Sequence, residues 1–464
     1  MSSASDDLRA MAEALSDAPP STTAMPSSSS VVVGGRGSYF PPVVVELAVQ
    51  LVRSAKVPLS STVKILSVVS EVLRLGWDVP HWTSVRNWVM RCGLARWQDG
   101  LQPADDWQFL ADHCVQMGTA KAFVTTGIRL GDYQKLGRAL RAEDLTLLRL
   151  ELMGQSTKEA VLRSYEETVR KVGVPLAVAN DNGADVAAGA RLLKKKHNQV
   201  RTILDCKHKA ACLLKKRLQN NERWTEFQKQ LATSKTQLQQ TELAFLTPPS
   251  QRSKARYMNV EHLLRWGEKV EALLEGRLDL GSGVEVKAER LEQKLGWLRG
   301  FEEEMAQWRE WLKTIDVVVG YVGKCGLSRT TEEQTREKMG RTRSETELGQ
   351  ELLTFIREQT KDLKEGETVV GSTEAVETIM GILKRLQGEN NKGGFTGLLL
   401  GLGLMVGKKS KESASQLLAQ ISMKDVRTWI KTKVGITVQS LRSRLTLAFE
   451  KTQQKPLHHY LPLT

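Results

Sequence analysis

Hydrophobic and polar positions change their spacing along the chain, and the changes divide it into segments. Between 39 and 98 apolar residues recur at helical spacing, as in VVVELAVQLVRS and STVKILSVVSEVLRLG. A Pro-broken turn and a short helix from about Trp82 to Arg91 follow. This pattern predicts two or three short helices.

The pattern between 106 and 205 is that of an α/β domain. Three apolar runs joined by short connections, DWQFLADHCVQMG, KAFVTTGIRLG and DLTLLRLELMG, predict an antiparallel meander of strands. A helix over 156–173 should follow, with Ser156 or Thr157 as cap. A strand at Pro175–Asn180, a helix at Ala184–His197 and a strand at 201–206 complete the predicted domain.

Strand patterns are almost absent from 207 to 365, where long Lys-, Glu-, Gln- and Leu-rich stretches predict amphipathic helices. A further helix is expected at 371–386, capped by Ser372 or Thr373. The apolar run GLLLGLGLMVG at 397–407 is far shorter than the ~20 residues of a membrane span and predicts a core helix. Residues 1–38 are rich in Ser, Ala, Pro and Gly and predict a disordered lead.

Composition adds a strong bias of charge. The chain has 464 residues, with 67 Lys and Arg against 53 Asp and Glu, a formal charge of +14. Such a surface favours polyanions, because neutralised phosphates release condensed counterions. The five cysteines form no CxxC pair, which argues against structural zinc and a disulfide framework. The N-terminus lacks the features of a signal peptide, so we expect a cytoplasmic protein without membrane contact, and the family resemblance described below implies that it is nucleoid-associated.

Candidate DNA contacts lie on the short helix near Trp82. Arg86, Asn87 and Arg91 would face a groove if this helix is the reader of a helix-turn-helix. The alternative is a small helical bundle whose last helix is simply solvated.

Three acidic residues are candidates for chemistry. Asp112 lies inside the apolar run FLADHCV, where an unpaired carboxylate would cost several kcal/mol to bury. Asp181 ends the fourth strand, where α/β sheets place ligand groups, although Asp before Asn-Gly also suits an ordinary turn. Asp185, inside the next helix, is a weaker substitute for Asp181.

The third acid, Glu377, lies on the helix after the long helical segment. Lys384 follows seven residues later on the same face, about 10 Å along the axis. Glu374 shares this face and competes with Glu377 for the same role.

An Asp in the first strand, an Asp after the fourth and a Glu with E-x6-K spacing on a late helix together resemble the DDE transposases of bacterial insertion sequences. Asp205 and His208, in DCKH, resemble the [C/D]xxH element of transposases with a long insertion before their Glu. The simpler interpretation of DCKH is a capped strand-to-helix junction. A large family of these enzymes has a Tyr seven residues before the Glu and an Arg four before it, whereas this chain has Val370 and Thr373.

The resemblance implies a fold and a function. It implies an α/β ribonuclease H-like catalytic core interrupted by a large all-α insertion, after an N-terminal all-α helix-turn-helix domain. The boundaries are 1–38 for the lead, 39–100 for the helix-turn-helix, 101–210 and 366–410 for the core, 211–365 for the insertion and 411–464 for a helical tail.

The implied activity is metal-dependent cleavage of DNA at the ends of a mobile element, followed by strand transfer (DNA transposition and recombination). Asp112, Asp181 and Glu377 would bind two Mg²⁺ or Mn²⁺ ions, Lys384 would contact DNA, and Asp205 and His208 would support the site. Partners would be double-stranded DNA, as transposon ends and target, and a second or further copy of the chain. The alternatives are an inactive or repurposed DNA-binding protein derived from a transposase, and a nuclease of the same fold that hydrolyses without strand transfer.

Overall fold

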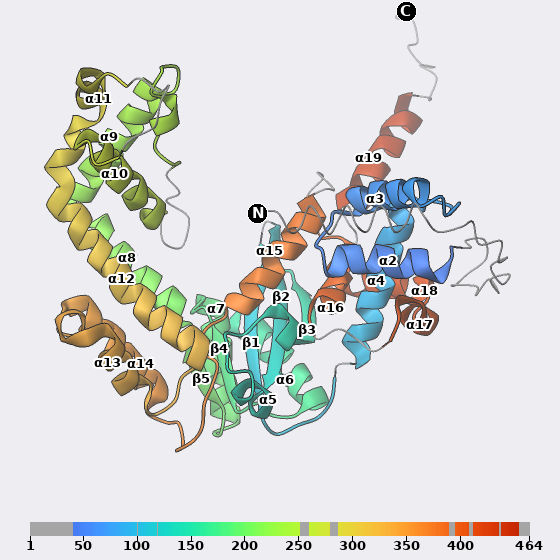
Figure 1. The fold of residues 1–464 in the computed structure, drawn as a ribbon. Coiled ribbons are helices and arrows are strands. Elements are labelled where there is room, and N and C mark those ends of the chain that lie inside the picture. The colour runs from blue at the N-terminus through green and yellow to red at the C-terminus, as the bar shows by residue number, and fades with distance from the viewer. Residues whose placement is uncertain are drawn as a thin grey trace, which may run out of the picture.

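The computed structural model describes residues 40–453 except 100, 118, 251–258, 279–285, 389–394, 408–411 and 436–437. The expected lead, 1–38, lies outside this part of the chain. The described chain is mostly helical around one five-stranded mixed sheet (Figure 1). Within it, no helix combines the length and the apolar character that crossing a bilayer requires.

The sheet has the spatial order β3-β2-β1-β4-β5. Its strands are β1 (Trp107–Met117), β2 (Ala120–Arg129), β3 (Thr146–Met153), β4 (Ala177–Asn180) and β5 (Arg201–Leu204). The first three form the predicted antiparallel meander, while β4 runs parallel to β1 and β5 parallel to β4. Short connections allow the antiparallel pairs, and α6 and α7 provide the longer crossovers that parallel strands need.

Helices cover both faces of the sheet. On one face α6 (Lys158–Val172) and α7 (Ala184–Lys196) pack on Phe109, Ala111 and Phe123. On the other, α15 (Glu374–Gly388) packs on β1, and Leu110 and Val124 share a core with α15 and with α8 (Cys206–Gln219). Because strand side chains alternate between faces, Asp112 takes the same face as Leu110.

The N-cap and the C-cap of α6 show how single residues define the ends of a helix. Thr157, one of the two expected caps, accepts a hydrogen bond from the amide of Ala160. Gly173 ends the helix with φ 94°, and a Cβ there would lie 2.5 Å from the carbonyl oxygen of Ala104. Only glycine satisfies both the left-handed backbone and this close approach.

The segment expected as a helical insertion forms an elongated arm in which α8 and α12 pack along each other (Figure 1). An aromatic cluster of Trp224, Phe227, Trp297, Phe301 and Trp308 joins its outer helices. After α8 its elements are α9 (Glu222–Leu238), η2 (Ala244–Leu246), α10 (Val260–Leu274), α11 (Ala288–Leu295), η3 (Gly296–Phe301), α12 (Glu302–Cys325), α13 (Thr331–Ser344) and α14 (Glu347–Thr360).

The N-terminal helices and those near the C-terminus share one hydrophobic core, although the sequence suggested a separate domain and a separate tail. The first group is α2 (Pro42–Arg53), α3 (Leu59–Val72) and α4 (Trp82–Asp99). The second is η4 (Gly397–Leu400), α16 (Gly401–Met405), α17 (Ala414–Gln420) and α18 (Met423–Trp429). The run at 397–405 is buried, as expected. The remaining elements are α5 (Leu130–Gln134), η1 (Ala142–Asp144), η5 (Ile430–Val434) and α19 (Val438–Gln453).

The prediction of a short helix ending near Arg91 was wrong, because α4 continues to Asp99. Gly93, which can be mistaken for a stop signal, instead lies where α4 meets η4 and α16. A Cβ on Gly93 would lie 2.0 Å from the carbonyl oxygen of Leu400. The glycine is needed for close helix packing, and α4 is a central core helix.

The segment that returns from the arm to the sheet is held by two buried polar side chains. The amide of Gln108 on β1 donates to the carbonyl of Val370 at 2.9 Å and accepts from its N–H at 2.6 Å. The carboxylate of Asp205, 1% exposed, accepts from the His208 N–H and the Thr373 N–H, both at 2.7 Å, and from the Thr373 hydroxyl at 2.5 Å. The start of α15 is therefore tied to the start of α8.

We predict that Asp205→Asn loosens the start of α15. An amide offers one accepting oxygen and turns a donor toward groups that themselves donate, so the free energy of unfolding should fall by about 2–3 kcal/mol. Hydrogen exchange should speed up over 369–377, and chemical denaturation should show the loss of stability.

Asp362→Asn is the matched control, because its side chain is 58% exposed and pairs only loosely with Lys194, at 3.7 Å. It should change stability by less than about 1 kcal/mol. Unchanged exchange over 369–377 in Asp205→Asn would contradict the role assigned to this carboxylate.

Candidate active site

Asp112 lies on β1, and Asp181 follows β4, the strand that runs parallel beside β1. In the pairing of β1 with β4, Leu110 is opposite Ala179. Asp112 lies two residues beyond Leu110 on β1, and Asp181 follows directly after the carboxyl end of β4, two residues beyond Ala179. Asp112 takes the Leu110 face by alternation, and both aspartates are half-buried. The fold thus brings together two of the three predicted acids.

The hydroxyl of Tyr165 is affected by the negative charge of the aspartates around the end of β4. Tyr165 is fully buried on α6, and its hydroxyl has no hydrogen-bond partner in the described structure. Burial raises its pKa, and the charges of Asp112, Asp181 and Asp185 raise it further. Three aspartates therefore lie within electrostatic range of one buried group.

The backbone around Asp181 also shows the turn chemistry that competed with a functional role. The Asp181 carboxylate accepts from the Gly183 N–H at 3.0 Å, and Asn182 has a left-handed backbone with φ 68°. Asp181 does not cap α7, whose N-cap is Gly183. The turn uses Oδ1 of Asp181 and positions the carboxylate at the strand end.

The structure distinguishes between the two glutamates of α15. Glu374 is 58% exposed and pairs with Lys207 at 2.6 Å. Glu377, one turn later, is half-buried beside the face that packs on the sheet, and its Oε1 is shielded from solvent. Lys384 is exposed two turns beyond Glu377 on the same flank. Glu377 is thus the better placed of the two to face the sheet.

Asp205 connects the end of β4, just before Asp181, with the start of α15, the helix that carries Glu377. Its N–H donates to the carbonyl of Asn180, the residue before Asp181, at 2.9 Å. Its carboxylate holds Thr373, four residues before Glu377. His208 contributes its backbone N–H, while its ring lies 3.5 Å from the sulfur of Cys212. The predicted capped junction between β5 and α8 is therefore present. It also ties the segment before Asp181 to the segment before Glu377.

Sequence analysis missed a polar cluster on the opposite face, beneath Asp112. His113 Nε2 lies 3.1 Å from both Asp185 Oδ2 and Ser156 Oγ, and Lys121 donates to the same Asp185 oxygen at 3.2 Å. The strand alternation of β1, which sends His113 to the face opposite Asp112, was the available signal.

This cluster is not a catalytic triad. In a triad the serine and the carboxylate contact different nitrogens of the histidine. Here Ser156 and Asp185 share Nε2, and Nδ1 is buried with no hydrogen-bond partner in the described structure. Asp185 is an ion-pair partner of Lys121, not a substitute for Asp181.

One of the candidate DNA-reading residues of α4, Arg91, must be corrected. Arg91 is 6% exposed and donates to the carbonyls of Leu418 and Ile421, so it joins α4 to the C-terminal helices and does not reach a groove. Arg86 and Asn87 are half-buried, and burial lowers the pKa of Arg86.

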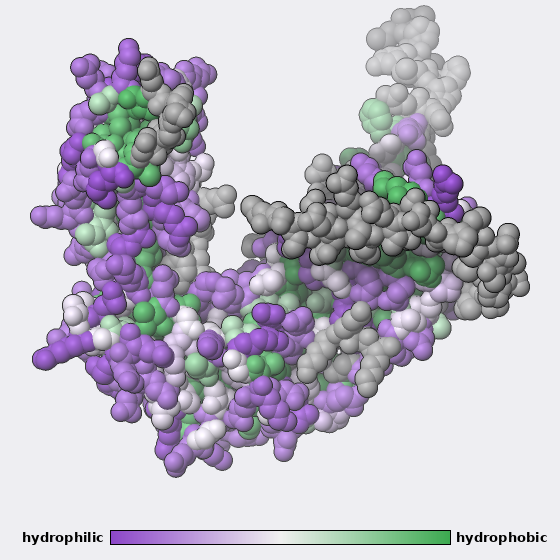
Figure 2. Space-filling view, viewed as in Figure 1, coloured by the Kyte–Doolittle hydropathy of each residue, from purple (hydrophilic) through white to green (hydrophobic). Residues whose placement is uncertain are grey.

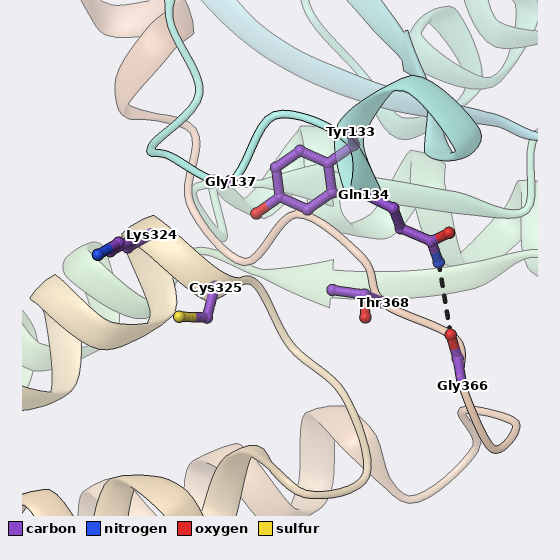
Figure 3. A pocket seen from close by; sticks show the side chains of 7 residues that line it. All are labelled: Tyr133, Gln134, Gly137, Lys324, Cys325, Gly366 and Thr368. Atoms are coloured by element: carbon purple, nitrogen blue, oxygen red, sulfur yellow. Dashed lines mark hydrogen bonds between the residues drawn. The ribbon is translucent and has the colours of Figure 1, made fainter.

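A pocket of about 330 Å³ lies away from these acids (Figure 3). Tyr133 and Gln134 of α5, Lys324 and Cys325 at the end of α12, and Gly366 and Thr368 line it. It belongs to the junction of the arm with the sheet and contains none of the candidate residues.

In the part of the chain that the structure describes, no three His, Cys, Asp or Glu side chains are gathered as a ready metal site. Carboxylates alone repel one another, so closing such a group requires a counter-charge. The donor set of Asp112, Asp181 and Glu377 is all oxygen, the type that Mg²⁺ and Mn²⁺ prefer.

The His113 cluster predicts a pH dependence of stability. Burial lowers the pKa of His113 below its usual 6.5, with Asp185 opposing the shift. The unfolded chain then binds this proton more readily than the folded one, so stability is full above about pH 6.5 and falls as the pH drops below it. His113→Gln should flatten this slope, by at most about 1.4 kcal/mol per pH unit.

Urea denaturation of wild type, His113→Gln and Ser156→Ala between pH 5 and 8 measures the difference. Ser156→Ala, which keeps the imidazole, should retain the wild-type slope. Parallel slopes for wild type and His113→Gln would refute the assignment.

Comparison with known proteins adds no relative: no family model matches the chain, and no curated protein matches it significantly.

Proposed function

We propose that the chain is a DDE-type DNA transposase that cleaves DNA at the ends of a mobile element and carries out strand transfer. The five-stranded mixed sheet, with helices on both faces, is compatible with a ribonuclease H-like catalytic core. The arm α8–α14 then corresponds to the helical insertion before the catalytic glutamate. The charge of +14 suits a polyanionic substrate.

One observation carries the proposal. Asp112 on β1 and Asp181 after the neighbouring parallel strand β4 both act electrostatically on Tyr165, and Asp205 bonds both to the residue before Asp181 and to the residue that starts the Glu377 helix. A chain without a charged ligand has little reason to gather acids in this way, because like charges at a half-buried site destabilise the fold.

Each residue has a role in this mechanism. Asp112, Asp181 and Glu377 would hold two Mg²⁺ or Mn²⁺ ions, which stabilise charge on the attacking and leaving oxygens of a phosphodiester. Lys384, exposed on the same flank as Glu377, would hold a DNA phosphate as a point charge. Asp205 and Gln108 would keep the Glu377 helix in place over the sheet.

The exposed edge of α15 offers a path for a DNA strand. Thr378, Gly381, Lys384 and Arg385 are all exposed along it, and no atom lies within 4 Å of the place where a Cβ of Gly381 would be. A backbone lying on this edge would run from the carboxylates to two cations. In the proposed function, two or more copies of the chain act together on paired DNA ends.

We predict that Asp112→Asn and Glu377→Gln each reduce Mg²⁺-dependent nicking by roughly 10²–10³-fold or more, the scale of losing one charge-stabilising group in an active site. DNA affinity should stay within a few-fold of wild type. A supercoiled plasmid carrying the DNA that flanks the coding sequence serves as substrate, with nicking read on gels and affinity by fluorescence anisotropy.

Glu374→Gln, at the exposed ion-paired position, should nick like wild type. Equal losses of binding and nicking in Asp112→Asn would show a structural role instead. DNA binding without any nicking by the wild type would favour the inactive, repurposed protein, and nicking without strand transfer would favour a nuclease.

Lys384→Ala should weaken binding of end DNA and lower the slope of log affinity against log salt by about 1, as expected for one lost phosphate contact. Lys384→Arg should retain most of the affinity. Lys361→Ala, at an exposed position on the arm, provides the matched control. An unchanged salt slope in Lys384→Ala would remove this residue from the DNA path.

A further inference from the structure

Large hydrophobic side chains that are exposed to solvent gather in two places on the described chain. One group lies on or beside α2–α4, and the other on α19. Phe245 and Leu278 are the two others found in the described ranges. The first group is Val43, Val68, Val72, Leu73, Leu75, Val79 and Trp82, and the second is Leu441, Leu445, Leu447 and Phe449.

The helix α19 has an apolar stripe that its own chain leaves uncovered. Leu441, Leu445 and Phe449 recur at i, i+4 and i+8, so they share one face, and they are 52%, 72% and 63% exposed. The helix extends away from the sheet (Figure 1), with hydrophobic side chains at its surface (Figure 2). A helix of 16 residues is marginal in water unless an apolar face is packed. The stripe therefore needs a partner.

The outer face of α3 has the complementary property. Leu66 and Ser70 bury the inner face, while Val68 and Val72, one turn apart, are 57% and 71% exposed. Leu73 and Leu75 extend this apolar surface beyond the helix end. We call Val68, Val72, Leu73 and Leu75 the α3 patch.

Charged side chains lie beside both surfaces, and one orientation of the contact pairs opposite charges. Arg442 and Arg444 flank the α19 stripe on its two sides, at about 100° and 300° from Leu441, whereas Glu450 lies opposite the stripe. The exposed acids beside the α3 patch are Glu71 and Asp78; Lys64, a turn before Val68, and Arg74 are the cations of this segment. Docking with the arginines toward Glu71 and Asp78 places opposite charges together.

We propose that α19 of one copy of the chain docks on the α3 patch of a second copy, and reciprocally. A two-fold arrangement of this kind uses the same two surfaces twice and covers both. It requires no DNA and does not depend on the proposed transposase activity.

Two charge-reversed chains test the proposal. One has Glu71→Arg and Asp78→Arg, and the other has Arg442→Glu and Arg444→Glu. Each alone places like charges at both contacts and should dimerise at least about tenfold more weakly than wild type. Mixed together, they restore opposite charges at both contacts and should dimerise again. Light scattering after gel filtration, without DNA, measures the mass.

Two further variants act as controls. Leu445→Asp and Phe449→Asp together should give monomers, and because both side chains are exposed this change does not disturb the core. Arg341→Glu, at a side chain that is 90% exposed on α13, should leave the dimer intact. Circular dichroism verifies that each variant is folded.

Three outcomes would overturn the proposal: a monomeric wild type at tens of micromolar, dimers that persist in the charge-reversed chains, and a mixture that stays monomeric. The last would indicate that α19 folds onto the patch of its own chain, because an intramolecular contact cannot be restored by mixing. None of these results bears on nicking by Asp112 and Glu377, so the two proposals fail separately.

Discussion

The structure depends on one buried carboxylate. Asp205 receives three hydrogen bonds from the starts of two helices, α8 and α15. Its partner Thr373, at the start of α15, lies 168 residues further along the chain. An unsatisfied buried charge is very costly, so these donors must stay in place whenever the chain is folded. Because hydrogen bonds are directional, they set the position of α15 more narrowly than apolar packing could.

The long arm makes these hydrogen bonds of Asp205 necessary for positioning α15. The chain leaves the sheet at Leu204 and returns near Val369, and everything between belongs to a helical unit with its own aromatic core. Gln108 pairs with both backbone groups of Val370, and Leu327 bridges to Val369, so the returning segment is tied at successive residues. These contacts fix the start of α15, the helix that carries Glu377.

The acids themselves lie where the fold does not need them. The charges of Asp112 and Asp181 act on the buried hydroxyl of Tyr165, whose pKa is raised first by burial and then by these charges. On the other face, Asp185 is compensated by Lys121 and by Ser156 and His113. This gathering of aspartates is the basis of the proposed function, in which Asp112 and Asp181 would bind a divalent cation.

Local patterns determined the elements of this protein, and tertiary structure decided how they combine. The five strands, the antiparallel meander of β1–β3, the helices α6, α7 and α15, the helical character of the arm and the cap of Thr157 follow from periodicity and turn residues, because these are properties of a few neighbouring positions. Sequence also placed Asp112 on the first strand and Asp181 directly after the fourth, as the structure has them. It could not choose between Glu374 and Glu377, since that choice depends on which side of α15 packs on β1.

Nor could the sequence show that α4 is a core helix. Arg91 is buried only because the carbonyls of Leu418 and Ile421, more than 300 residues away, accept its hydrogen bonds. Gly93 is required only by the close approach of Leu400. Contacts between residues so far apart leave no periodic trace in either segment, and only the folded chain brings them together.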